Sequence, residues 1–171
     1  MNRLVIQNVI RGLVLIFFQV MVLNNIYLGG YVNPFLYILF ILMLPVGMPK
    51  AALIFLSFLA GFFVDLFSST LGMHTFSATL IGFLRVVLAD NILTKREKIT
   101  IDVPSIKNIP FSTYTAYVVL LTFVYSLSYY IIESFLISDM LLIIIRAVLS
   151  TAVTYLMIIS CEFLFMGRKK K

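Results

Sequence analysis

The sequence of 171 residues contains no tryptophan, one histidine and one cysteine, and only 12% of its residues are charged. A single cysteine excludes an intramolecular disulfide framework. One histidine and one cysteine give none of the paired ligand spacings of zinc sites, and the glycine patterns of P-loops and dinucleotide-binding folds are missing. We therefore expect no metal and no other cofactor.

Apolar residues, by contrast, are abundant. They make up 62% of the chain and give it a mean hydropathy of +1.10. Soluble domains are closer to half apolar, and long runs without charge indicate membrane spans. The net charge of +6 comes from short basic islands between apolar runs, a pattern typical of cytoplasmic loops that gives nucleic-acid binding no support. The sequence predicts an all-α integral membrane protein, with residues 1–171 as one polytopic domain.

Apolar runs and turn residues predict a bundle of six transmembrane helices. The second run is short for a span, because about 15 residues rise only roughly 22 Å as a helix, and Pro45 and Pro49 bracket its end. A competing count of five spans would treat residues 34–67 as one broken or re-entrant element. The expected helices cover residues 8–28, 34–48, 51–67, 73–93, 113–137 and 140–166, with a cytoplasmic loop at 94–112.

The basic residues predict the orientation of the six-span model. Lysine and arginine are absent from the three proposed outer loops, residues 24–33, 68–72 and 138–139, whereas the other loops and the C-terminal tail carry them. Cytoplasmic loops carry the excess of positive charge. We expect both termini and the 94–112 loop to be cytoplasmic; whether that loop pairs as a hairpin or stays irregular is left open.

Four of the expected helices carry small or polar residues at steps of three and four, so each has one face of this kind. Such faces let membrane helices approach closely and form hydrogen bonds, and we expect them to meet inside the bundle. The faces consist of Ser57, Gly61, Asp65 and Ser68; His74, Ala78, Gly82, Arg85 and Ala89; Thr115, Thr122, Ser126, Tyr129 and Glu133; and Arg146, Ser150, Thr154 and Cys161.

Helical depth indicates which ionisable groups lie near each other. Asp65, His74, Glu133 and Arg146 all fall near the outer side, so we expect one cluster in which Arg146 pairs with Asp65 or Glu133. Arg85 lies deeper, and we expect it to reach Glu162 or the cytoplasmic surface. Ionisable groups in hydrocarbon mark function by default, although buried ion pairs also serve only to fix helix register.

Nothing in the chain predicts catalysis. Ser68, Ser69 and His74 lie near Asp65 in the sequence. A serine hydrolase needs a nucleophile hydrogen-bonded to a base, an acid that orients the base, and an oxyanion hole. Proximity in sequence supplies none of these, so we expect a protein without catalytic residues.

The segment GFFVDLFSSTLGMH, residues 61–74, resembles the motif of the MreD family of rod shape-determining proteins. That motif is a glycine, a few apolar residues, Asp-Leu, small polar residues and then Gly-x-His; Asp65, Gly72 and His74 match it. Arg85 matches an arginine that some members have, often before a proline, but here Val86 follows. Size, helix pattern and the basic loop fit across nearly the whole chain.

The resemblance implies a non-catalytic component of the bacterial inner membrane that acts in cell elongation, cell shape and peptidoglycan synthesis. Its expected partners are an MreC-like bitopic membrane protein and, through it, MreB filaments and peptidoglycan synthases. We expect the hairpin of the third and fourth helices to shape the surface that partners recognise. The residues expected to give the hairpin this function are Gly61, Asp65, Gly72, His74, Gly82 and Arg85. Glu133 and Arg146 are expected to form a buried polar network.

The family fold is also similar to the substrate-binding S-components of energy-coupling-factor transporters, which gives an alternative function. In that alternative the chain is the membrane subunit that binds a small, vitamin-type molecule. S-components often carry small-xxx-small spacing on the first helix, whereas this one reads RGLVLIFFQVMVLNN and is bulky throughout. A channel or flippase subunit would need a continuous polar path, which Gln19 and Arg85 alone do not establish.

Overall fold

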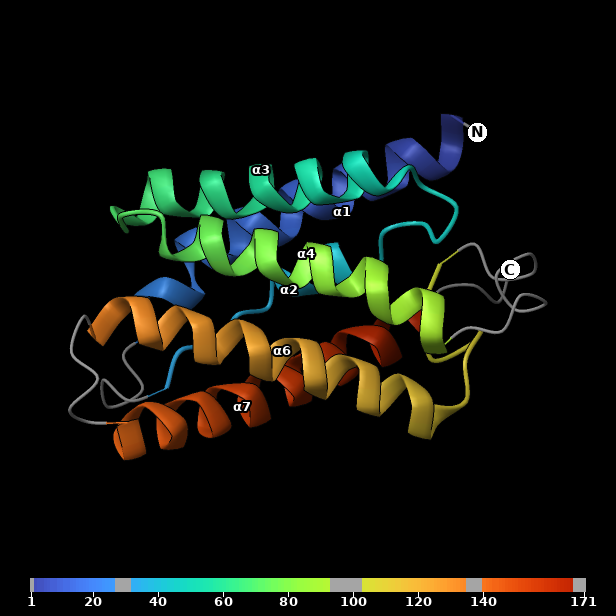
Figure 1. Ribbon diagram of the computed structural model, residues 1–171. Helices are drawn as coiled ribbons and strands as arrows, with labels where there is room; N and C mark the ends of the chain where they lie inside the picture. Colours follow the sequence, from blue (N-terminus) through green and yellow to red (C-terminus); the bar gives the residue numbers. More distant parts are fainter. Residues whose placement is uncertain (1, 27–31, 93–102, 135–139, 168–171) are drawn as a thin grey trace.

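The computed structural model describes residues 2–26, 32–92, 103–134 and 140–167, and within them the fold is an all-α bundle (Figure 1). A short 3₁₀ helix, Leu23–Asn25, follows α1. The α-helices are α1 (Asn2–Met21), α2 (Ile38–Leu42), α3 (Lys50–Ser68), α4 (Met73–Ile92), α6 (Phe111–Ser134) and α7 (Met140–Gly167).

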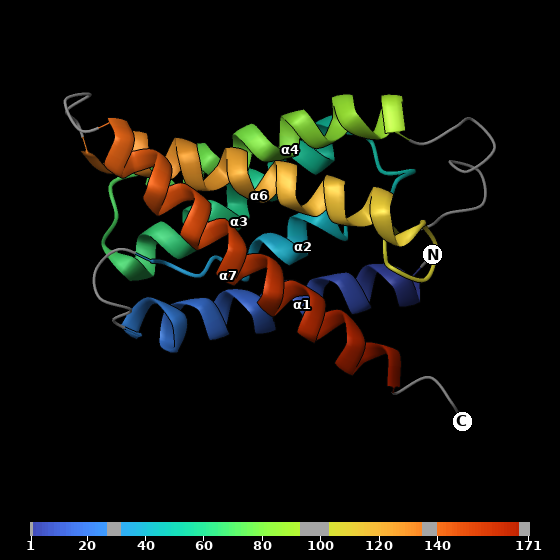
Figure 2. The same cartoon turned by 90° about the horizontal axis from the view of Figure 1, so that it is seen from below.

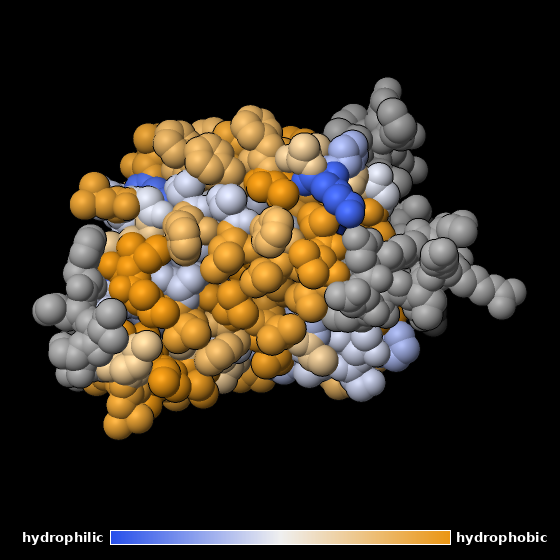
Figure 3. Space-filling view, viewed as in Figure 1, coloured by the Kyte–Doolittle hydropathy of each residue, from blue (hydrophilic) through white to orange (hydrophobic). Residues whose placement is uncertain are grey.

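Four helical segments are long and apolar enough to cross a membrane, and α4 has a shorter apolar stretch, Met73–Leu88. Apolar side chains cover most of the face seen in Figure 3. Length and composition are those of a multi-pass membrane protein, as the sequence predicted. The four segments are Asn8–Asn25, Lys50–Ser68, Phe111–Ser134 and Met140–Leu164.

The helix boundaries agree with the predicted ones within two residues at most ends that the structure describes. The exception among the long helices is α1, which begins at Asn2, six residues earlier than predicted, and ends at Met21, seven residues before the predicted end at residue 28. The predicted ends at residues 93 and 137 lie outside the described residues. So does most of the 94–112 loop; its described part, residues 103–110, contains a turn in which the amides of Asn108 and Ile109 donate to the carbonyl of Ser105.

The predicted second helix, residues 34–48, is wrong. Only Ile38–Leu42 is helical, and five residues rise about 7.5 Å, too little to cross a bilayer. Pro45 has no N–H to donate, and its ring would clash with the carbonyl four residues earlier, so the helix ends before it. Even so, Figures 1 and 2 show residues 32–49 running from one end of the bundle to the other, so that α1 and α3 point the same way. We call residues 32–49 the buried crossing.

The buried crossing forms the centre of the core. Its side chains from Phe35 to Leu42, and Leu44, are all buried, and they pack against residues from α1, α3, α4, α6 and α7. Non-helical backbone at membrane depth is tolerated where it is enclosed by protein and its polar groups find partners. The position of this segment therefore determines where the polar side chains of the surrounding helices have to point.

Candidate functional site

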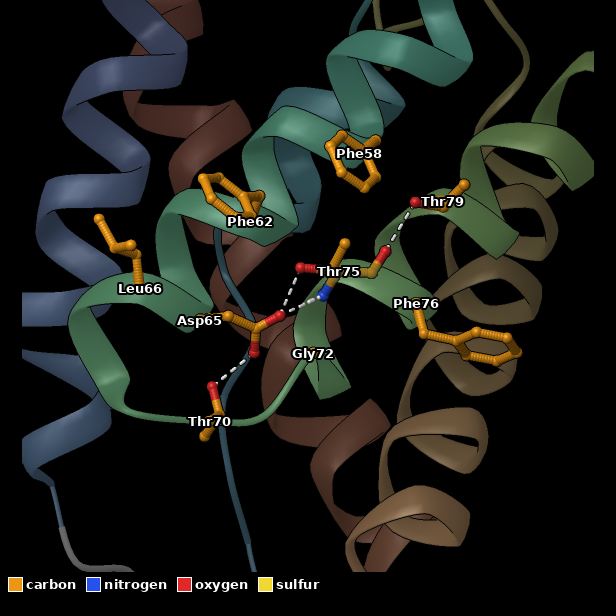
Figure 4. A pocket seen from close by; sticks show the side chains of 9 residues that line it. All are labelled: Phe58, Phe62, Asp65, Leu66, Thr70, Gly72, Thr75, Phe76 and Thr79. Atoms are coloured by element: carbon orange, nitrogen blue, oxygen red, sulfur yellow. Dashed lines mark hydrogen bonds between the residues drawn. The ribbon is translucent and has the colours of Figure 1, made fainter.

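The turn between α3 and α4 is organised by Asp65. Its Oδ1 accepts hydrogen bonds from Thr70 Oγ1 at 2.5 Å and from the amide of His74 at 3.1 Å. Its Oδ2 accepts from the amide of Thr75 at 2.7 Å and from Thr75 Oγ1 at 2.5 Å (Figure 4). The first amides of a helix have no partner inside the helix, and a negative charge is favoured there. Asp65, at the end of α3, thus caps α4 and closes the hairpin.

Three glycines give this hairpin its shape. A Cβ at Gly61 would lie 2.5 Å from the carbonyl oxygen of His74, and one at Gly82 would collide with the side chain of Ser57. Gly72 has φ +82° in the turn, a conformation that side chains disfavour. The structure thus has Gly61 and Gly82 at close contacts between α3 and α4, and Gly72 in the turn between them.

His74 joins the hairpin to the rest of the core. It is 2% exposed, and its Nδ1 lies 2.6 Å from Tyr125 Oη on α6, which in turn lies 2.7 Å from Tyr37 Oη in the buried crossing. Its ring packs against Tyr129 and Phe35, with centroid separations of 4.8 and 5.8 Å. His74 is thus a buried connection between three segments of the chain.

Arg85 is one of the largest fully buried side chains, and its contacts differ from those predicted. Its Nε donates to Tyr117 Oη at 2.9 Å, and its Nη2 donates to the carbonyl of Leu44. Glu162, the predicted partner, instead accepts from Tyr114 Oη at 3.2 Å. Leu44 lies two residues past the end of α2, so its carbonyl needs a donor from elsewhere, and the guanidinium supplies one.

Other helices supply similar partners along the buried crossing. Gln19 on α1 donates to the carbonyl of Pro34 at 2.8 Å and accepts from the amide of Tyr37 at 3.3 Å. Thr154 on α7 accepts from the amide of Phe35 at 2.9 Å. The remaining bonds run from the amide of Asn33 to Ser150 Oγ at 3.0 Å and Tyr130 Oη at 3.2 Å, and from Tyr117 Oη to the carbonyl of Leu42 at 3.2 Å.

Tyr129 lay on a predicted polar face, but the sequence did not predict roles for Gln19 or for the other tyrosines of α6. A signal was present for the tyrosines, because Tyr114, Tyr117, Tyr125 and Tyr129 recur at steps of 3, 8 and 4 on one side of that helix. The polar faces of α3, α4, α6 and α7 did predict buried positions, including Ser57, Ser126, Ser150 and Thr154.

The four ionisable residues predicted to form one outer cluster form two units instead, Glu133 with Arg146 and Asp65 with the start of α4. Arg146 Nη1 lies 2.9 Å from Glu133 Oε2, which confirms the Glu133 alternative for its ion pair, and its guanidinium carbon lies 4.5 Å from the ring centroid of Tyr130. Asp65 instead takes the neutral donors of the hairpin. Ring packing of Tyr129 on His74 and of Tyr130 on Tyr129, the latter at 5.4 Å, joins the two units.

A groove of about 600 Å³ follows the seam between α3 and α4 on the surface of the bundle (Figure 4). Phe58 and Phe62 stack with their planes 12° apart along one side, and Phe76 stands on the other. The hydroxyl of Thr79 donates to the carbonyl of Thr75 at 2.7 Å, so it is satisfied within the hairpin. The groove is lined by Phe58, Phe62, Asp65, Leu66, Thr70, Gly72, Thr75, Phe76 and Thr79.

Comparison of the chain with protein-family models, curated proteins and solved structures found no match. The likeness to the MreD family therefore depends on the segment that carries Asp65, Gly72 and His74, and it enters below as a proposal.

Proposed function

We propose that this chain is a non-catalytic membrane component of the bacterial cell-elongation complex, which acts in cell shape and peptidoglycan synthesis by binding an MreC-like bitopic protein. In this proposal it lies in the inner membrane as a six-crossing protein of the MreD type. The buried crossing is one of the six passes, and both termini and the 94–112 loop face the cytoplasm. MreB filaments and peptidoglycan synthases are reached through the bitopic partner.

The observation that carries the proposal is that the residues of the motif act as one unit. Asp65 caps the helix that begins after Gly72, and His74 ties that same helix to α6 and to the buried crossing. All of these contacts shape a hairpin. A scaffold needs a surface held in one conformation, because preorganisation lowers the entropy that binding costs.

The arrangement of the core supports a scaffold over the transporter-subunit alternative. A subunit that binds a small molecule needs an internal cavity, commonly several hundred Å³ in volume. Here the buried crossing places Tyr37, Ile38 and Ile41, each with 0% exposure, in the middle of the described bundle. The groove described above lies instead on the surface, where a membrane partner has access to it.

The test of the proposal uses two variants that disturb the hairpin, Asp65→Ala and Gly72→Leu, in cells whose own copy is deleted. We expect both variants to insert into the membrane, to co-purify less of the MreC-like partner and to give wider cells. Gly47→Leu is the matched control, because a Cβ there meets nothing within 4 Å. Normal width and full co-purification in both variants would reject the hairpin as the functional element, and a vitamin-like molecule bound to the purified protein would favour the alternative.

The orientation is tested separately with reporter fusions at the two termini and within residues 94–112. The proposal requires all three reporters to be cytoplasmic, because lysine and arginine are absent from the three predicted outer loops and present in the termini and in residues 94–112. A C-terminal reporter outside the cytoplasm would contradict the six-crossing topology.

A further inference from the structure

The exposed surface of the bundle differs in chemistry between the α3–α4 hairpin and α7. The large exposed side chains of α7 are all aliphatic from Leu141 to Leu156, and an exposed phenylalanine, Phe163, follows near the end of the helix. The hairpin exposes phenylalanines instead. Lipid chains require only an apolar surface, whereas aromatic side chains are enriched where proteins bind proteins. Of the exposed phenylalanines of the hairpin, Phe58, Phe62 and Phe76 line the groove. Phe55 and Phe83 lie three and seven residues further along the same two helix faces, whereas Phe63 and Phe67 are exposed on another face of α3.

The hairpin surface also has a ridge and a groove of the kind against which helices pack. Phe58, Phe62 and Leu66 are spaced four residues apart and form one ridge of α3, while Phe76 rises from α4 on the other side of the groove. Helices pack by placing the ridges of one into the grooves of another, and four-residue ridges are the commonest kind. Because Gly61 and Asp65 hold α3 and α4 together, the groove exists before any partner arrives.

The apolar surface continues past the end of the helices. Leu71 lies in the turn, beyond the last residue of α3, and is 90% exposed; Leu66, two residues before the end of α3, is also exposed. A partner that follows the groove therefore also covers Leu71 as it leaves the membrane at that end. A lipid chain alone would leave this side chain at the membrane surface.

The area of this surface suits one transmembrane helix. A fully buried aromatic side chain covers about 150–250 Å², so the five roughly half-exposed phenylalanines of these two faces offer about 400–600 Å² together, to which Leu66 and Leu71 add. Stable interfaces bury about 800 Å² on each partner. A single helix seated on the groove would thus come close to that requirement without any soluble domain.

We propose that the groove between α3 and α4 is the seat of a partner's single transmembrane helix, which lies along the Phe58–Phe62–Leu66 ridge and contacts Leu71 where it leaves the membrane. This inference rests on the proposed function, since it names the surface through which the bitopic partner is held.

Disulfide cross-linking in native membranes tests this inference. The background is the full chain with Cys161→Ser, co-expressed with the MreC-like bitopic protein of the same organism, whose transmembrane helix carries cysteines one position at a time. Phe62→Cys and Thr79→Cys report on the groove. Leu149→Cys on α7 is the matched control, because Leu149 is 44% exposed and Phe62 is 43% exposed. We expect the groove positions to cross-link at least about tenfold more than the control, with a period of three to four residues along the partner.

A second arm measures binding without cysteines. Phe62→Ala combined with Phe76→Ala is expected to lower recovery of the partner at least about tenfold, whereas Leu149→Ala combined with Leu156→Ala leaves it unchanged. Equal unfolding temperatures in detergent establish that both double variants are folded.

The outcomes separate this inference from the proposed function. Co-purification with cross-links from α7, or unchanged recovery of the partner by the groove double variant, overturns the inference alone. Cross-links between the grooves of two copies overturn it in favour of a homodimer. If the unsubstituted chain does not co-purify with the partner, the proposed function itself fails.

Discussion

Asp65 and Arg85 both place a charged group inside the bundle, and both use it to bind backbone. Asp65 binds the amides that begin α4, within a hairpin whose partners lie 5 to 10 residues away. Arg85 binds the carbonyl of Leu44, 41 residues away and two residues past the end of α2. Asp65 is therefore a local helix cap, whereas Arg85 binds non-helical backbone that is distant in the chain.

The difference indicates how the two regions depend on the rest of the fold. The hairpin cap needs only α3, a turn and the start of α4 to be in place. The buried crossing needs Gln19, Tyr117 and Thr154 from three other helices as well as Arg85. Because unsatisfied polar groups are most costly in a membrane core, we expect substitutions around the buried crossing to be the more damaging.

The largest effect is expected for Arg85→Ala. The substitution empties a large buried volume, removes the donor to the carbonyl of Leu44, and leaves Tyr117 Oη with the carbonyl of Leu42 but without Arg85. The free energy of unfolding should therefore fall by about 3–5 kcal/mol. Equilibrium unfolding in detergent measures it. Arg11→Ala is the control, because Arg11 is half-buried and its hydrogen bond to Asn8, at 3.3 Å, is local. An equal loss in both variants would remove the distinction between local and tertiary contacts.

The next effect is expected for Gly61→Ala. The new Cβ meets backbone, the carbonyl of His74 and the Cα of Thr75, so α3 and α4 must separate. Overpacking of this kind costs about 1–3 kcal/mol. Gly47→Ala has open space and should change stability by less than about 0.5 kcal/mol. A loss at Gly47 as large as at Gly61 would contradict the close approach of the two helices.

A smaller loss, about 1–2 kcal/mol, is expected for Asp65→Ala, because it removes a helix cap. It should stay below the 3–5 kcal/mol typical of a broken buried ion pair, since the partners of Asp65 are neutral amides and hydroxyls. Hydrogen exchange localises the effect: the amides of His74 and Thr75 should exchange faster, while those in the middle of α6 stay protected. Uniform acceleration throughout the bundle would show that Asp65 supports more than the hairpin.

The smallest effect is expected for Gly72→Ala, about 1 kcal/mol, because the residue has φ +82°. Asparagine tolerates this left-handed conformation better. Gly72→Asn should therefore recover much of the lost stability in the same unfolding experiment. If alanine and asparagine are equally tolerated, the turn does not depend on backbone conformation at this position.

Local features of the sequence predicted the long helices α3, α4, α6 and α7 and the hairpin motif. Runs of apolar residues, small residues at helical spacing, and a Gly-x-His after Asp-Leu all depend on neighbours within a few turns. The same reasoning placed Gly61, Gly72 and Gly82 at close contacts or in the turn. It also left the ion pair of Arg146 open between Asp65 and Glu133, because helical depth alone does not say which faces meet.

The tertiary structure alone decided the path of residues 32–49 and the partner of Arg85. By composition this segment is apolar and resembles a short span, and its prolines indicate only that a helix ends nearby. Whether its backbone leaves helical geometry depends on donors and acceptors supplied from elsewhere, such as Gln19 from 15 residues away and Thr154 from 119 residues away. The sequence thus determined the helices, whose backbone hydrogen bonds are local. Tertiary packing determined the buried crossing, whose backbone is bound by side chains distant in the chain.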